Sequence, residues 1–234
     1  MAKNHYGLFF RFAQKIARIV LPRYRFEKVA ENHDPVVYVS HHQNMVGPVS
    51  ILAWLKYYVR TWVLAEFTDQ EACFKHYYNY TFTERYGWSK WLSKSLAWPV
   101  SYIVPMLTKS ANMIPVYRGS RKVVKTMQIS NEALLNGEDL MIFPDIDYSN
   151  DSKETSEIYE GFLHLEKKYY RETEKHLTFI PVFSDKDKRE VLVGEEIQFT
   201  GDQSFIEERK DIAKIIQTEL NRLSQVKEKQ VVKK

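Results

Sequence analysis

The sequence predicts an α/β domain whose mostly parallel, mixed sheet is covered by helices on both faces. Short apolar segments rich in β-branched and aromatic residues alternate with longer stretches in which apolar residues recur every three or four positions. Such alternation favours a parallel sheet. No internal repeat or linker divides the chain, and its 234 residues, 44% of them hydrophobic, suit one sizeable core. We expect an α/β domain over residues 23–224, preceded by a helical segment at 1–22 and followed by a polar tail at 225–234.

The N-terminal segment is expected to form a basic amphipathic helix over residues 6–21, which Pro22 ends. Apolar and basic side chains lie on different faces of this helix; they are Phe9, Phe12, Ile16 and Ile19, and Arg11, Lys15 and Arg18. The helix either lies in a bilayer interface or packs on its own domain, and we keep both alternatives. The basic residues also interrupt any signal peptide, and no apolar stretch reaches the roughly 18 residues of a spanning helix. A membrane association is therefore expected to be peripheral.

The first half of the domain is expected to hold two strands, a helix between them and an aromatic segment. Residues 36–39 and 62–65 are β-branched or apolar and predict buried strands. Residues 49–60 predict a helix because their apolar side chains share one side. Residues 66–104 are aromatic without a clear period, so short helices in an irregular arrangement are expected there.

The second half continues the alternation of strands and helices. Strands are expected at 113–117, 140–143 and 177–183, with shorter ones at 190–193 and 197–199. Helices are expected at 120–136, which Gly137 closes, at 158–172 and at 204–224. Residues 145–157 are polar and rich in acids, which predicts a loop.

Distinctive polar residues follow three of the predicted strands. His41 and His42 follow the first strand, Arg118 follows the third, and Pro144 and Asp145 follow the fourth. Ligands of such sheets bind beyond the carboxyl ends of the strands, so these side chains are expected to converge. A histidine can take a hydroxyl proton near neutral pH, and an arginine can hold a phosphate with two hydrogen bonds. This combination suits group transfer to a hydroxyl of an anionic substrate.

The order of these residues resembles the glycerolphosphate and lysophospholipid acyltransferase family, the PlsC-like enzymes. The likeness covers roughly residues 30–200 and lies in four blocks. They are His41-His42-Gln43-Asn44-Met45-Val46-Gly47, Ile114-Pro115-Val116-Tyr117-Arg118, Phe143-Pro144-Asp145-Ile146-Asp147-Tyr148-Ser149 and Phe179-Ile180-Pro181-Val182. The resemblance implies a PlsC-like fold and an acyltransferase that works at a membrane surface in phospholipid metabolism.

The resemblance also implies roles for individual residues. His42 is the general base that deprotonates a hydroxyl of a glycerol-phosphate or lysophospholipid-like acceptor. Arg118 binds the acceptor phosphate, and Asp145 binds its other hydroxyl, beside Asn44 and Pro144. The acyl donor is acyl-CoA or an acyl-carrier-protein (acyl-ACP) thioester, and no cofactor or metal is required.

The first block departs from the family pattern at Gly47. The family has an aspartate there, which orients the catalytic imidazole, and glycine has no side chain to do so. In a serine protease the loss of the orienting carboxylate costs about 10⁴ in turnover. Asp145 and Asp147 are the candidates to replace it, so both belong to the predicted catalytic set with His42.

Three interpretations remain open. The chain is a divergent acyltransferase in which another acid orients His42, or a lipid- or acyl-binding module of the same fold that has lost catalysis. In the third interpretation the reaction differs, and the acidic loop at 145–157 binds a cation or another acceptor. The net charge of +4 and the absence of a basic-aromatic module argue against nucleic acid as a partner. The single cysteine, Cys73, indicates a reducing compartment, so a cytoplasmic location at the membrane surface is expected.

Overall fold

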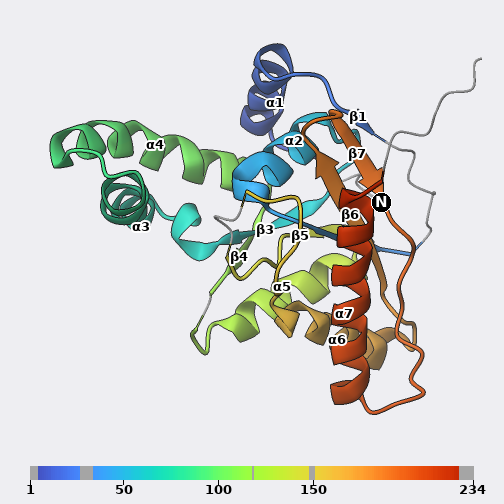
Figure 1. Ribbon diagram of the computed structural model, residues 1–234. Coiled ribbons are helices and arrows are strands. Elements are labelled where there is room, and N and C mark those ends of the chain that lie inside the picture. Colours follow the sequence, from blue (N-terminus) through green and yellow to red (C-terminus); the bar gives the residue numbers. More distant parts are fainter. Residues whose placement is uncertain (1–4, 27–33, 118, 148–150, 227–234) are drawn as a thin grey trace, which may run out of the picture. The chain divides into compact units, whose positions relative to one another are not determined.

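The computed structural model describes residues 5–26, 34–117, 119–147 and 151–226 (Figure 1). These residues form seven strands and seven α-helices in the alternating order of an α/β protein, which confirms the predicted fold class. Their contacts divide the chain into two compact units. Unit 1 comprises Met1–Leu21 and Lys56–Leu140, and unit 2 comprises Pro22–Leu55 and Met141–Lys234.

Unit 2 contains most of the sheet. Its strands are β1 (Arg25–Phe26), β2 (Val36–Ser40), β6 (Thr178–Asp185), β7 (Glu190–Val193) and the end of β5 (Leu140–Ile142). They run in the order β1-β7-β6-β2-β5, with β2 parallel to β6, β1 parallel to β7, and β6 antiparallel to β7. Every residue of β2 and β6 is buried, as expected for central strands that are covered on both faces.

Helices of unit 2 cover both faces of β6. They are α2 (Val46–Trp54) and α7 (Phe205–Ser224), and the third helix of the unit is α6 (His164–Thr173), entered through the 3₁₀ turn Glu160–Leu163. Ser184 of β6 meets Ser50 of α2, whereas its neighbour Phe183 packs against Leu223 of α7. Successive side chains of a strand point to opposite faces, so α2 and α7 lie on opposite sides.

Unit 1 contains the parallel pair β3 (Arg60–Leu64) and β4 (Ile114–Val116), together with four helices. These are α1 (Leu8–Val20), α3 (Gln70–Lys75), α4 (Lys90–Ser110) and α5 (Val123–Leu135). A 3₁₀ turn at Ala65–Thr68 precedes α3, and the π-helix η3 (His76–Arg85) follows it. Figure 1 shows α3, viewed nearly end-on, next to α4, and both α3 and η3 are in contact with α4.

Most predicted elements are confirmed, and three corrections follow. The helix expected at 49–60 begins at Val46 and ends at Trp54. The strand expected at 197–199 is a single bridge between Phe179 and Ile197. The end of the segment expected to be irregular is instead the 21-residue helix α4, which continues through Pro99 and Pro105.

Other predictions concern the ends and the membrane. The N-terminal helix is present as α1, and the short strand β1 was not foreseen. The tail beyond residue 226 lies outside the described residues. Among the helices that the structure describes, none combines the length and hydropathy required to cross a bilayer.

Candidate functional site

The candidate site in unit 2 starts with a left-handed turn directly after β2. Gln43, Asn44 and Met45 have φ angles of 44°, 48° and 80°. The left-handed region costs roughly 1–2 kcal/mol for each residue with a Cβ, so three in succession need compensation. Part of it comes from Gln43, whose side chain is buried and donates to the carbonyl of Ser184 over 2.9 Å. Strain of this kind is typical of functional sites.

His41 is the buried member of the histidine pair. Its Nδ1 lies 2.5 Å from Oδ1 of Asp145, and its Nε2 lies 3.1 Å from the carbonyl oxygen of Ser152. Both partners of the ring are oxygen atoms that can accept a hydrogen bond. Because both ring nitrogens are engaged and the side chain is buried, His41 cannot reach a substrate in this state.

His42 is the accessible member of the pair. Its ring is partly exposed and meets the ring of Phe143 edge-on, with 5.8 Å between the ring centroids. Its Nδ1 accepts a hydrogen bond from the main-chain N–H of Met45 over 3.2 Å. A neutral imidazole whose Nδ1 accepts carries its proton on Nε2. The left-handed turn therefore holds His42 in the tautomer opposite to that of a base acting through Nε2.

Asp145 joins the first and third sequence blocks. Its Oδ1 binds the His41 ring, and its Oδ2 accepts the main-chain N–H of His42 over 2.8 Å. The carboxylate predicted to orient the His42 imidazole thus contacts the imidazole of the neighbouring histidine and fixes only the backbone of His42. The ends of β2 and β5 converge as expected, but Asp145 pairs with the ring of His41 instead of that of His42.

The remaining predicted site residues are distributed around this junction. Pro144 is buried, and its carbonyl accepts the N–H of Tyr159 over 2.8 Å. Asn44 is half-buried within the left-handed turn, and Asp147 is exposed two residues beyond Asp145. Arg118 lies outside the described residues.

Gly47 occupies a position that accepts no side chain. It is buried, and a Cβ atom added there would lie 2.2 Å from the carbonyl oxygen of His41. Its N–H donates to the carbonyl of His42 over 3.1 Å, which folds the chain tightly back on itself. An aspartate at position 47 is therefore incompatible with this turn.

A second set of polar residues fastens the loop that covers His41. Lys153 lies 3.3 Å from Asp185 and 2.7 Å from Asp187, one residue after the Ser152 carbonyl. Burial alone would raise the pKa of Asp185, but the N–H groups of Lys188 and Asp187 and the Lys153 ammonium outweigh it, and the pKa lies below its usual value. No sequence signal marks these residues, because Ser-Asp at the end of a strand is typical of an ordinary turn.

Comparisons with known proteins support the fold. No protein-family model matches the sequence, and no curated protein matches it either. Among solved structures, the crystal structure of the 1-acyl-sn-glycerophosphate (LPA) acyltransferase PlsC from Thermotoga maritima is similar, with a TM-score of 0.52. The two share 13% sequence identity over 93% of this chain and 79% of that one. At this identity the likeness shows the fold, and the chain has a PlsC-like fold.

Proposed function

We propose that the chain is a divergent PlsC-like acyltransferase that acts at a membrane surface. It would move an acyl group from acyl-CoA or acyl-ACP to a hydroxyl of a glycerol-phosphate or lysophospholipid-like acceptor. The observation that carries the proposal is the Asp145 bridge, because it brings the histidine block and the Phe-Pro-Asp block together within hydrogen-bond distance. The likeness of fold to PlsC adds support.

His42 is the proposed base, because its ring is partly exposed whereas that of His41 is buried. The acceptor hydroxyl would give its proton to Nε2 while its oxygen attacks the thioester carbonyl. The C–S bond then breaks, and the leaving thiolate takes the proton from the imidazolium. In this scheme Asp145 is a positioning residue that holds the His42 backbone. Arg118 and Asn44 would contact the acceptor. Asp147 is the candidate carboxylate that could accept a hydrogen bond from Nδ1–H of His42.

This scheme requires the left-handed turn to change during catalysis. His42 can act as a base through Nε2 only after Met45 N–H leaves Nδ1, so that Nδ1 can carry the proton. The strained backbone of residues 43–45 favours such a rearrangement, because leaving the left-handed region releases free energy. Acceptor binding is the proposed trigger.

The Met45 contact also favours a second candidate function. If the turn stays as it is, His42 keeps the wrong tautomer, a state that costs about 10⁴ in turnover in a serine protease. The domain would then be a lipid- or acyl-binding module without catalysis. Binding and turnover separate the two candidates.

The deciding experiment measures thiol release from acyl-CoA in the presence of liposomes and a panel of phosphorylated and lyso-lipid acceptors. Acceptor-dependent release that disappears in His42→Ala and persists in His164→Ala, an exposed histidine of the same unit, supports the transferase. Acyl-CoA binding without any release supports the module. Full release by His42→Ala contradicts the role given to His42.

A spectroscopic measurement sharpens the result. Nitrogen-15 chemical shifts of the imidazole report which ring nitrogen carries the proton. We expect the Nε2–H tautomer of His42 in the free protein and the Nδ1–H tautomer when acceptor is bound. An unchanged Nε2–H tautomer in the complex supports the lipid- or acyl-binding module without catalysis.

The location at a membrane is part of the proposal. The face of α1 that carries Leu8, Phe12 and Ile19 is exposed, and Arg11, Lys15 and Arg18 flank it. Such a helix suits the interface of an anionic bilayer. Phe12→Asp is expected to weaken liposome binding, and unchanged binding would contradict the docking role of α1.

A further inference from the structure

Helix α4 of unit 1 is built with its large apolar side chains outward. Its buried positions are small or polar and recur along one side of the helix; they are Ser93, Ala97, Ser101, Pro105 and Thr108. Its exposed positions hold the bulky residues, which we call the α4 outer face; they are Trp91, Leu92, Leu96, Trp98, Tyr102, Ile103 and Met106. Trp91 is 79% exposed and Trp98 is 61% exposed. A surface helix of a globular protein usually buries its large apolar residues and exposes its polar ones, and α4 does the opposite.

The buried side of α4 accounts for its position. Ser101 accepts a hydrogen bond from Gln70 of α3 over 3.1 Å and donates to the carbonyl of Trp98 over 2.8 Å. Thr108 donates to the carbonyl of Phe67 over 3.0 Å. Small residues let helices approach closely, and these hydroxyls satisfy the polar groups that the contact buries. The hydrogen bonds that hold α4 against its neighbours therefore come from its small, polar side.

The serine among the bulky residues of the outer face has an internal hydrogen-bond partner. Ser95 is exposed among the bulky residues, and its hydroxyl donates to the carbonyl of Trp91 over 3.0 Å. A serine bonded back to its own helix loses little when it leaves water. Trp98 and Tyr102 pack against each other with 5.2 Å between their ring centroids, and both ring types favour the interface between lipid and water.

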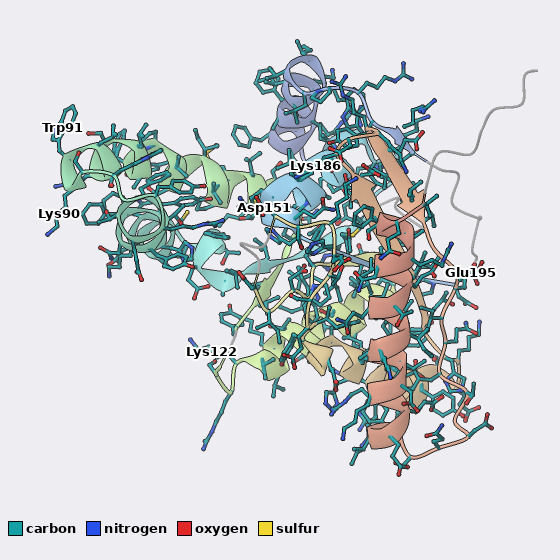
Figure 2. All side chains as sticks on the ribbon, viewed as in Figure 1. Lys90, Trp91, Lys122, Asp151, Lys186 and Glu195 are labelled. Carbon is teal, nitrogen blue, oxygen red and sulfur yellow. The ribbon has the colours of Figure 1, made fainter. Side chains whose placement is uncertain are left out.

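Charge identifies what the outer face would contact. The 21 residues of α4 include Lys90, Lys94 and Lys109 and no Asp or Glu. Figure 2 shows Lys90 and Trp91 projecting from the first turn of α4, away from the ribbon. Cationic side chains beside an exposed aromatic and aliphatic face are complementary to a monolayer with anionic headgroups.

Helix α1 is joined to the other end of α4. The N–H of Gly7 donates to the carbonyl of Ser110 over 2.7 Å, and the N–H of Phe10 donates to its hydroxyl over 3.0 Å. A Cβ atom at position 7 would lie 2.6 Å from that hydroxyl. Two basic helices without acids, each with exposed apolar residues, are thus fixed within one unit.

We propose that the α4 outer face is a membrane-docking surface whose aromatic and aliphatic side chains enter the headgroup region of an anionic bilayer. The proposal goes beyond acyl transfer, and binding to vesicles does not depend on whether His42 is catalytic. It assigns the larger share of apolar contact to α4, with α1 as the neighbouring element.

The test is co-sedimentation of the full chain with vesicles of phosphatidylcholine and phosphatidylglycerol, beside vesicles of phosphatidylcholine alone. Trp98→Asp and Ile103→Asp are each expected to weaken binding about tenfold or more, because each removes one inserted apolar side chain. Ile206→Asp is the control, since Ile206 is 64% exposed on α7 in the other unit and should have no effect.

The lysines have a matched control as well. Lys90→Ala/Lys94→Ala should weaken binding to the anionic vesicles about thirtyfold and leave the phosphatidylcholine vesicles unaffected. Lys210→Ala/Lys214→Ala removes two exposed lysines at the same spacing on α7 and should change little. Equal effects of the two pairs would overturn a specific role for α4.

Tryptophan fluorescence shows insertion directly. Vesicles with brominated acyl chains should quench the emission of the natural protein, and Trp91→Phe/Trp98→Phe should remove most of that quenching. Unchanged binding in both aspartate variants overturns the proposal. So does a natural dimer that Trp98→Asp converts to a monomer in sedimentation velocity without any loss of vesicle binding, because the face would then join two copies. Circular dichroism confirms that each variant keeps its helices.

Discussion

Helices α4 and α7 have nearly the same length, 21 and 20 residues, and opposite designs. The buried stripe of α7 is aliphatic; it consists of Ile212, Ile216, Leu220 and Leu223. The buried stripe of α4 is small and polar, and its aliphatic and aromatic residues face outward. Both helices bury side chains at helical spacing along one side, and those side chains are large in α7 and small in α4.

A periodic apolar face has a different partner in each of the two helices. A periodic apolar face indicates that something apolar covers one side of a helix, and in α7 that cover is β6 of the same chain. In α4 the apolar side has no such cover among the described residues, and the chain supplies its own contact on the opposite side. The same pattern therefore predicts a core face in one helix and a docking face in the other.

The largest expected effect is on the free energy of unfolding, when one isoleucine of each helix is replaced by alanine. Ile216→Ala should lower the free energy of unfolding by about 2–5 kcal/mol, because it opens a cavity in the core. Ile103→Ala removes the same atoms from the outer face of α4 and should change it by no more than about 0.5 kcal/mol. Urea titrations followed by circular dichroism measure both, and equal losses would remove the distinction between the helices.

A smaller effect on stability is expected when a serine on the buried side of α4 is replaced by leucine, and none when the serine is on the exposed side. Ser101→Leu should cost about 1–3 kcal/mol, because the added atoms overfill a fully buried position and the hydrogen bond to Gln70 is lost. Ser95→Leu makes the same change on the exposed side and should leave the urea midpoint unchanged. If Ser95→Leu is as costly as Ser101→Leu, the outer face is packed against the protein in solution.

The smallest effect concerns pH, since α7 contains carboxylates and α4 has none. The Arg222 hydrogen bond, opposed by burial, lowers the pKa of Glu219 below 4.5. A depressed pKa stabilises the fold above the ordinary carboxyl range, and this contribution is lost as the pH falls through the folded value. Glu219→Gln should therefore be less stable than the natural protein at neutral pH.

The difference between Glu219→Gln and the natural protein should shrink as the pH drops below 4.5. Asp211→Asn, which removes an exposed carboxylate from the same helix, controls for the change in net charge. A constant difference across the pH range would show that the ionisation of Glu219 contributes nothing to stability.

Much of the fold could be predicted because its signals are local. Strands such as β2 and β6 are continuous apolar runs, and α7 has a complete aliphatic stripe. The end of α2 was misplaced because the apolar run continues past Trp54 into β3, so the pattern gives no stop. Helix α4 was missed because its prolines and its outward apolar face hide the small residues that set its packing.

For the candidate site, the sequence predicted that the two strand ends meet, but it did not predict which side chains pair there. Strand order brings His42 and Asp145 to the same end of the sheet, and the sequence shows that each follows a strand. Which histidine the carboxylate binds depends on the backbone between them. Three residues with a Cβ adopt the left-handed conformation there, and no residue preference predicts that run.

The close approach at Gly47 also bears on how such a chain can change over generations. With this turn in place, a mutation to aspartate at position 47 would place its Cβ against the His41 carbonyl, so the turn would be strained before the acid could contact His42. The turn at residues 43–45 would have to be rebuilt first, and that change alone brings no orienting carboxylate to His42. The two changes would be useful only in combination, so no single substitution at position 47 can supply His42 with an orienting carboxylate.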